Sequence, residues 1–256
     1  MHGLGNDIMI VDCLTNRWNV TKDHILALAD RHTGIGFDQL ITIEPNKTSA
    51  DVFCRIFNPD GSEAQQCGNG LRCIARYLSD KKIISSQSLT IETIAGIFPL
   101  IIHDENNIAM TMNSPTMLAK ELMLTVANMT AKVVYLMLGN PHAIMRVDDV
   151  FALPIESIGK ALSTHPHFTE GANIGFMQID SPQQITLRTY ERGAGLTLAC
   201  GSNASAAVVA GISQGWLKSP VTVQFARGNL IISWDGKDKV IMQGPASWCY
   251  HGEAIL

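Results

Sequence analysis

The sequence has few charged residues and no long run of apolar ones. Charged residues occupy 16% of its 256 positions, whereas about a quarter is usual in globular proteins. Hydrophobic residues occupy 46%, and this combination argues against a disordered chain. No stretch reaches the roughly 18 consecutive apolar residues of a membrane helix, and no run of lysine and arginine marks a membrane surface. We therefore expect a folded protein with no membrane partner.

Basic character and an export signal are also missing. The formal net charge is −4 and the sequence pI is about 6.0, which argues against a basic nucleic-acid-binding surface. The first residues, MHGLGNDIMIVDC, lack the basic segment and small-residue cleavage site of a secretory signal. We therefore expect a cytoplasmic protein without a nucleic-acid partner.

The common cofactor and metal motifs are absent or incomplete. Gly34-Ile-Gly36 and Gly193-Ala-Gly195 lack the third glycine of a dinucleotide fingerprint. The GxxxxGK[ST] and GxSxG patterns do not occur, and no lysine lies in a recognisable Schiff-base motif. His142 and the other histidines have no zinc-ligand spacing to a cysteine pair, because the chain has no CxxC. We expect no cofactor and no metal.

The chain does contain cysteine, and an even number can indicate disulfides. Disulfide scaffolds, however, are typical of short secreted chains, and this chain is neither short nor visibly secreted. For a single cysteine the default expectation is a small, buried apolar side chain. Context must single out any exception among the six: Cys13, Cys54, Cys67, Cys73, Cys200 and Cys249.

Two segments of the chain repeat each other. Arginine precedes cysteine by the same distance in Arg55…Cys67 and in Arg188…Cys200, since 67 − 55 and 200 − 188 are both 12. The two cysteines are 200 − 67 = 133 positions apart. Polar landmarks recur at nearly the same offset, which predicts a duplicated half. These matched pairs are Asn6 with Asn140, Gln39 with Asn173, and Asn58 with Glu191.

The periodicity of apolar residues predicts a mixed α/β structure. A helix is expected directly after each of Cys67 and Cys200, and the second is apolar on nearly all sides, which is typical of a core helix. Peripheral helices are expected at 21–29 and 150–163. Strands are expected at 8–12, 39–43, 52–57, 89–93, 108–112, 133–138, 185–190, 221–225, 230–234 and 240–244.

Each repeated element, a cysteine followed by a helix, is suited to acid/base chemistry. A cysteine at a helix N-terminus faces unpaired backbone N–H groups and the positive end of the helix dipole, so we expect the pKa of each thiol to fall below about 8.5. Gly68 and Gly201 let backbone amides approach an anion such as a carboxylate. Inverting a carbon centre by proton transfer needs a base on one face and an acid on the other. Two facing copies of the element would supply that pair.

Seven segments carry a family signature in one order along the chain. They are MHGLGND (1–7), RHTGIGFDQ (31–39), FNPDGSEAQQCGNGLRC (57–73), GNPHA (139–143), EGANIGFMQ (170–178), RTYERGAG (188–195) and ACGS (199–202). In these segments the chain resembles the diaminopimelate epimerases along essentially its whole length. CGNGLRC and YERGAG separate it from the related proline racemases and phenazine-biosynthesis isomerases, which lack the two cysteines in this setting.

The resemblance implies a PLP-independent amino-acid epimerase, an isomerase that interconverts LL- and meso-diaminopimelate in lysine and peptidoglycan-precursor biosynthesis. It implies an α/β protein of the α+β type with two pseudo-symmetric domains, each a mixed β-sheet wrapped around a central helix. We place these domains at residues 1–113, with about 246–256 returning to them, and at 114–245. The resemblance also implies an active site between the domains, diaminopimelate as the small-molecule substrate, and a homodimer.

The same resemblance implies roles for individual residues. Cys67 and Cys200 match the catalytic acid/base pair, and His142 and Glu191 match groups that assist them. The amides of Gly68-Asn69 and Gly201-Ser202 match those that hold the carboxylate at the reacting centre. The matched substrate-binding residues are Asn6, Gln39, Asn58, Gly68, Asn69, Asn140, Asn173, Glu191, Arg192, Gly201 and Ser202.

The residue types suit a substrate with two amino-acid ends. The guanidinium of Arg192 can form a bidentate pair with the distal carboxylate. The carboxylate of Glu191 and asparagine amide oxygens can accept from the distal ammonium. Each asparagine also has a structural alternative as a capping or turn residue, Arg192 has one as half of an ion pair, and His142 has one as a packed core side chain.

Four features depart from the family pattern. Leu196 stands where a glutamate is usual, Asn203 stands where a glycine is usual, and Ala143 often is cysteine. We expect Asn203 to be tolerated in a left-handed turn. The chain also begins where relatives carry a few more residues that form a first strand, so we expect an exposed sheet edge.

Three functions remain open at this point. The first is an active diaminopimelate epimerase. The second is a racemase of another amino acid, since Arg192 and Glu191 do not fix the substrate's length. The third, which Leu196 and Asn203 suggest, is a catalytically weak binding or regulatory homologue.

Overall fold

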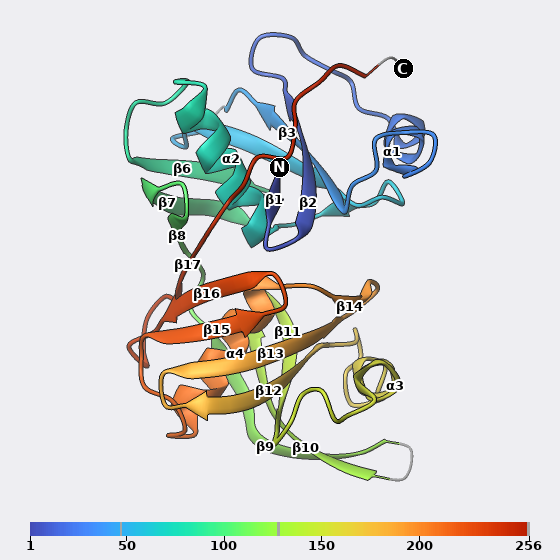
Figure 1. Cartoon of the computed structure of the whole chain (residues 1–256), viewed down its shortest axis with the longest axis vertical. Helices are drawn as coiled ribbons and strands as arrows, with labels where there is room; N and C mark the ends of the chain where they lie inside the picture. The colour runs from blue at the N-terminus through green and yellow to red at the C-terminus, as the bar shows by residue number, and fades with distance from the viewer. Residues whose placement is uncertain (47, 127–128, 255–256) are drawn as a thin grey trace. The chain divides into compact units, whose positions relative to one another are not determined.

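The computed structural model describes residues 1–46, 48–126 and 129–254. The chain forms two compact units (Figure 1): residues 1–110 with 244–256, here called the N-terminal unit, and residues 111–243, the C-terminal unit. The chain enters the C-terminal unit after Met110 and returns to the N-terminal unit after Gln243. A division into independent domains at 113 and 245 stays a prediction.

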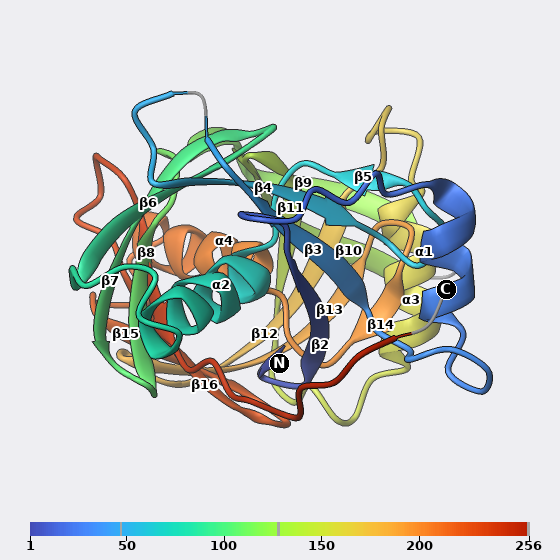
Figure 2. The ribbon, with the colours of Figure 1, turned by 90° about the horizontal axis from the view of Figure 1, so that it is seen from above.

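The N-terminal unit is a mixed sheet with two helices. Its helices are α1 (Lys22–Ala29) and α2 (Gly68–Asp80), and α2 packs against β1, β2, β3 and β7 (Figure 2). Its strands are β1 (His2–Gly3), β2 (Asn6–Asp12), β3 (Gln39–Glu44), β4 (Val52–Phe57), β5 (Glu63–Ala64), β6 (Ser88–Thr93), β7 (Gly96–Asp104) and β8 (Asn107–Thr111).

The C-terminal unit has the same kinds of element. Its helices are α3 (Ile155–Ser163) and α4 (Gly201–Ser213), and α4 packs against β10, β11, β12 and β16. Its strands are β9 (Thr116–Val126), β10 (Met129–Leu138), β11 (Asn140–Val147), β12 (Asn173–Ser181), β13 (Gln184–Glu191), β14 (Gly195–Thr197), β15 (Val221–Phe225), β16 (Gly228–Ser233) and β17 (Ile241–Gly244).

From β2 in one unit and from β11 in the other, the two units share one order of elements and one pattern of pairing. β2 pairs parallel with β3, β3 antiparallel with β4, and β4 parallel with β6. β11, β12, β13 and β15 repeat these three pairings in the same order. Even the register repeats, because Ile8 lies opposite Gln39 while His142 lies opposite Asn173, and both members differ by 134 (142 − 8 and 173 − 39). The sequence repeat is therefore a repeat of structure, and the expected α/β class with mixed sheets is confirmed.

The two central helices begin in the same way but bury different surfaces. Cys67 and Cys200 are both N-cap residues with extended backbone, at φ −147° and −129°. α2 has a buried apolar face and a less buried polar face, on which Arg76 is partly covered and Asp80 is exposed. α4 is alanine- and valine-rich and buried through most of its length, because it lies in the middle of its unit. The sequence expectation of two helices starting at the cysteines is confirmed.

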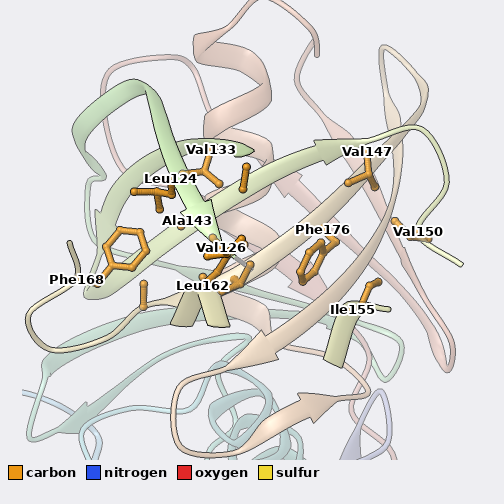
Figure 3. Packing of buried hydrophobic residues seen from close by; sticks show 13 residues of the cluster. Leu124, Val126, Val133, Ala143, Val147, Val150, Ile155, Leu162, Phe168 and Phe176 are labelled. Atoms are coloured by element: carbon orange, nitrogen blue, oxygen red, sulfur yellow. The ribbon is translucent and has the colours of Figure 1, made fainter. Parts of the chain in front are cut away.

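A hydrophobic core lies between the sheet and α3 in the C-terminal unit (Figure 3). Phe168 and Phe176 are among its largest side chains, and Ile155 and Leu162 contribute the buried face of α3. The core draws on β9, β10, β11 and β12, so the outer helix is held by burial of its apolar stripe, at roughly 25 cal/mol per Å² of apolar area removed from water. This packing fixes the strands that carry Asn140, His142 and Asn173.

Several strands were not predicted from the sequence. The four helices and ten strands that it expected are present, and each predicted end lies within five residues of the observed one. It left out β7, β9, β11 and β12 and the short strands β1, β5 and β14. β7 contains Pro99 and β12 contains Gly175, residue types that weaken a strand pattern. The sheet edge that we expected to be exposed at the start of the chain is partly covered, because β1 pairs with β2 and His2 forms a bridge with Ser247.

Candidate active site

In the N-terminal unit, Cys67 lies at a junction of polar groups. As N-cap of α2, its Sγ accepts from the Gly70 backbone N–H at 3.3 Å and lies 3.7 Å from Oδ1 of Asn6, the first residue of β2. Asn69, nearly fully buried, donates to the same Asn6 oxygen at 3.3 Å. The structure therefore brings Cys67, Asn6 and Asn69 together as one cluster. A Cβ at Gly70 would overlap Cδ1 of the Ile41 side chain, so a larger residue there would require that side chain to move.

Two further predicted residues of this unit form a pair. Gln39 opens β3 and Asn58 follows β4, and Gln39 Nε2 donates to Asn58 Oδ1 at 3.2 Å. Asn58 in turn donates to Ser62 at 3.0 Å, within the turn after β4. The other amide oxygen, Gln39 Oε1, is buried and has no hydrogen-bond partner among the described residues. A buried acceptor of this kind is suited to receive a ligand N–H.

In the C-terminal unit, Cys200 is in a different environment. Its side chain is buried, with 7% of the residue exposed, and its Sγ lies 3.4 Å from Oγ of Ser202. Burial raises the pKa of the Cys200 thiol well above its usual value, and the nearby carboxylate of Glu191 raises it further. The backbone N–H of Asn203 and the Ser202 hydroxyl only partly offset these effects. The expectation of a lowered pKa is therefore wrong for Cys200, because burial and a negative charge outweigh the helix N-terminus.

The remaining predicted residues of this unit come from adjacent strand ends. His142 Nε2 lies 2.7 Å from Asn140 Oδ1, both on β11. The Arg192 backbone N–H donates to Asn173 Oδ1 at 2.9 Å, which ties the turn after β13 to the start of β12. The Arg192 guanidinium is exposed and donates to the Glu170 carbonyl at 2.6 Å, so it is held yet remains accessible to an anion.

Glu191, at the end of β13, is fixed by a residue that sequence reasoning missed. Thr197 Oγ1 donates to its carboxylate at 2.5 Å across the β13–β14 hairpin. In the N-terminal unit the missed residue is Asp38, which accepts from Asn6 Nδ2 at 3.1 Å and from Arg31 at 2.9 Å. Asp38 belongs to the RHTGIGFDQ motif, so its motif membership was the available signal.

His142 is fully buried and neutral. Burial lowers the pKa of its imidazole to about 3, and the positive charge of Arg192 adds to this effect. Nδ1 has no hydrogen-bond partner among the described residues. At neutral pH the ring can therefore orient Asn140 or share a hydrogen bond, but it does not carry a charge.

The buried His142 is expected to make stability depend on pH. An unfolded histidine binds a proton below about pH 6.5, while the native ring does not until about pH 3. The unfolded state thus binds more protons in this window, and stability falls as the pH falls from about 6.5. Between pH 7 and pH 5.5 the wild-type chain is expected to lose about 1 kcal/mol more than His142→Gln. Urea unfolding of both proteins at both pH values measures this, and equal losses would contradict it.

The residues that depart from the family pattern leave α4 intact. Leu196 is exposed on β14 opposite Tyr190, and Ala143 is buried in the core. Asn203 does not occupy a left-handed turn as expected. It lies within α4 with a negative φ, fully buried, and its side-chain oxygen fills the space beside Gly175. In the other unit Ile41 fills the equivalent space over Gly70.

Replacing Asn203 by alanine is expected to stabilise the chain. Neither polar atom of its amide has a hydrogen-bond partner among the described residues, and such a buried group costs about 1–3 kcal/mol. Alanine also favours a helix interior by roughly 0.5 kcal/mol, while the small cavity it leaves costs part of this gain. Asn203→Ala should raise the free energy of unfolding by about 1 kcal/mol. The free energy of unfolding of Asn203→Gly should be about 1 kcal/mol lower than that of Asn203→Ala. If alanine instead destabilises the chain, the Asn203 amide has hydrogen-bond partners and the prediction is wrong.

Among the described residues, no three or more histidine, cysteine or acidic side chains are grouped so that they could hold a metal ion. Within the same residues, no helix is both long and apolar enough to cross a membrane.

Comparisons with known proteins agree with the geometry of both units. A family model described as diaminopimelate epimerase matches residues 1–118 and 134–249. The chain is 42% identical over 269 aligned positions to a curated diaminopimelate epimerase of Pseudomonas syringae pv. tomato, and 41% identical to one of Azotobacter vinelandii. Each alignment covers 100% of this chain and 98% of the relative.

Solved structures of lower identity share the fold. A Bacillus anthracis protein of the PhzF phenazine-biosynthesis family matches with a TM-score of 0.76 at 19% identity, over 100% of this chain and 95% of the other. A hydroxyproline epimerase from Agrobacterium vitis matches with a TM-score of 0.72 at 14% identity, over 95% and 87% of the two chains.

Proposed function

Because this chain belongs to the diaminopimelate epimerase family, we propose that it interconverts LL- and meso-diaminopimelate, an isomerase step of lysine and peptidoglycan-precursor biosynthesis. The reaction exchanges the proton at one α-carbon and inverts that centre. The observation that carries the proposal is the pair of cysteines, each the N-cap of the central helix in one of two units with the same pairing order.

Cys67 and Cys200 are the proposed acid/base pair. One thiolate removes the α-proton, and the thiol on the opposite face returns a proton, so that both sulfurs must reach the same carbon. A Cys200 thiol whose pKa is raised well above its usual value is suited to the acid role at neutral pH. In the reverse direction the roles exchange. No cofactor is needed if backbone amides stabilise the carbanion.

The amides at the two helix starts are proposed to bind the reacting carboxylate. Gly68 and Asn69 begin α2, and Gly201 and Ser202 begin α4, so their N–H groups lie in the first turn and point toward the N-terminal end of each helix. Such groups favour an anion and become more favourable as charge moves onto the carboxylate. The helix starts therefore serve binding and catalysis together.

The distal amino-acid end is assigned to the polar residues of the strand ends. We propose that the exposed guanidinium of Arg192 binds the distal carboxylate, with the Glu191 carboxylate on the ammonium. Amide groups complete the contacts: Asn6, Gln39, Asn58, Asn140 and Asn173. His142 is proposed to assist as a neutral hydrogen-bonding group, since the pKa of its ring lies at about 3.

Deuterium exchange tests the proposal directly. The purified chain with LL-diaminopimelate in D₂O should form the meso isomer with one deuterium at the inverted α-carbon and none at the other. Heat-denatured protein is the control. Turnover of a one-ended amino acid in preference to diaminopimelate would support a different racemase, and tight binding without exchange would support a non-catalytic homologue. Either result would overturn the proposed function.

A homodimer is proposed from the family resemblance, and a cytoplasmic location is proposed with it. Sedimentation equilibrium of the full chain tests the first, with a mass of 27.8 kDa marking the monomer.

A further inference from the structure

Two carboxylates share one arginine at the starts of β2 and β3. Arg31 donates to Asp7 through both terminal guanidinium nitrogens, at 2.7 and 3.0 Å, and one of these nitrogens also donates to Asp38 at 2.9 Å. Asp7 is the second residue of β2, and Asp38 comes directly before β3. These three residues, here called the ion triad, therefore lie where the parallel pairing of the two strands begins, with Ile8 opposite Gln39.

Backbone groups attach the ion triad to both strands. The Asp7 backbone N–H donates to Asp38 Oδ2 at 3.1 Å, and the Asp38 backbone N–H donates to Asp7 Oδ1 at 2.8 Å. These reciprocal bonds fix each carboxylate relative to the start of the other strand. The adjacent residues in the chain are Asn6 and Gln39, which are both proposed to contact the substrate. The ion triad therefore also sets the distance between these two residues.

The ion triad determines which way the Asn6 amide faces. Because a carboxylate only accepts, Asn6 must direct its Nδ2 toward Asp38 Oδ2, which lies 3.1 Å away. The Asn6 Oδ1 then faces the start of α2, where it accepts from Asn69 Nδ2 at 3.3 Å and lies 3.7 Å from Cys67 Sγ. Turning the amide by 180° would place its oxygen against the Asp38 carboxylate and its nitrogen against that of Asn69. One orientation is therefore strongly favoured.

A contribution to stability does not account for the ion triad. The exposed fractions of the three side chains are 54% for Arg31, 36% for Asp7 and 46% for Asp38. Ion pairs at such exposure contribute little to the free energy of unfolding. What these residues do provide is a fixed direction for an amide of the candidate site.

The C-terminal unit holds the matching asparagine in a different way. Neither carboxylate of the ion triad recurs there, since the residues at the offset of 134 from Asp7, Asp38 and Arg31 are Pro141, Ala172 and His165. The counterpart of Asn6 is Asn140, whose Oδ1 lies 2.7 Å from His142 Nε2. Each unit thus restrains this asparagine, with a partner that the repeat does not share. Unrelated partners for the same amide indicate that its orientation matters to the site.

We propose that Asp38, held by Arg31 and Asp7, is a positioning residue that fixes the Asn6 amide for substrate binding, with the amide oxygen toward the start of α2. The inference rests on the proposed function, because Asn6 is one of the proposed substrate-binding residues. Asp38 is assigned an action through Asn6, with no contact of its own to the substrate.

A double-mutant cycle measures whether Asp38 acts through Asn6. Asp38→Asn should lower kcat/KM for diaminopimelate about 10-fold, because an amide cannot accept at both ends, as Asp38 does from Arg31 and Asn6, and a displaced binding group lowers the rate by this order. In the Asn6→Ala background the same substitution should change kcat/KM less than about 2-fold. Equal losses in the two backgrounds would overturn the proposal.

Asp51→Asn is the matched control. Asp51 is another exposed carboxylate of the N-terminal unit that joins two strands, because it precedes β4 and accepts from the backbone N–H and the hydroxyl of Thr90 on β6, at 2.7 and 2.9 Å. It belongs to neither the ion triad nor the candidate site, so Asp51→Asn should keep kcat/KM within about 2-fold of wild type. A loss as large as that of Asp38→Asn would show a general effect on the sheet and overturn the proposal.

The side-chain amide of Asn6 gives a readout that needs no turnover. Its two N–H signals in a ¹H–¹⁵N spectrum of the full chain are those that Asn6→Ala removes. Asp38→Asn should move both signals and speed their exchange with water, whereas Asp51→Asn should leave them in place. Unchanged signals in a folded Asp38→Asn protein would overturn the proposal.

Should Asp38→Asn not fold, Arg31→Met allows the same comparison, because it removes the guanidinium and keeps both carboxylates. It should also move the Asn6 signals, and unchanged signals would again overturn the proposal. If the Asn6 signals respond to these substitutions but the wild-type chain does not epimerise diaminopimelate, the proposed function fails while the positioning of Asn6 by Asp38 stands.

Discussion

Replacing either Cys67 or Cys200 by alanine is expected to lower kcat for epimerisation by about 10³-fold or more, since a positioned acid or base contributes about 10²–10⁴-fold. Each variant loses proton transfer on one face of the α-carbon, and inversion needs both faces. KM should change much less, because alanine leaves the helix-start amides in place. Initial rates with LL- and meso-diaminopimelate measure both constants.

Other cysteines of the chain provide the controls. Cys249 is exposed and Cys54 is fully buried, with its pKa raised by that burial. Neither belongs to the proposed acid/base pair, so Cys249→Ala should retain wild-type kcat, and Cys54→Ala should affect stability more than kcat. Full epimerisation by Cys67→Ala or Cys200→Ala would rule out the two-thiol mechanism.

The parts of the fold that the sequence predicted are those with local signals. Val52–Phe57 and Val221–Phe225 are short β-branched and aromatic runs, and the structure has strands with these same bounds. β9 was missed because residues such as Leu118, Ala119 and Lys120 also favour helices. Its strand conformation depends on antiparallel pairing with β10, which is information that lies outside the segment.

In the candidate site, too, only the features with a local sequence signal could be predicted. The two cysteines were identified because the pattern of a helix start and the internal repeat can both be recognised in the sequence. The raised pKa of Cys200 was not, since it depends on burial and on Glu191 brought near by the β13–β14 hairpin. Arg72 belongs to the CGNGLRC motif, but its burial and its partners could not be predicted from that motif. Only the structure shows its guanidinium donating to Asn69 and to the Pro245 carbonyl.

Arg192 is the residue whose loss should affect substrate binding most. Its guanidinium is exposed, and a hydrogen bond to the Glu170 carbonyl and the backbone bond to Asn173 fix its position. Arg192→Met should lower kcat/KM for diaminopimelate about 100-fold, because a charged hydrogen bond to a carboxylate contributes about 1.5–3 kcal/mol and the paired geometry is lost with it.

The expected pattern distinguishes binding from folding. Most of the Arg192→Met effect should be on KM, with the thermal midpoint within about 2 °C of wild type, since exposed side chains contribute little to stability. Arg188→Met is the matched control: this arginine lies on β13, the strand that ends directly before Arg192, donates to the Val150 carbonyl at 3.3 Å and stacks over Phe151. It should keep KM within about 3-fold of wild type.

Arg192→Lys should recover only part of the loss, because an ammonium cannot form the bidentate pair. If Arg192→Met leaves KM unchanged, the distal carboxylate is bound elsewhere, and the choice of a two-ended substrate loses its main structural support.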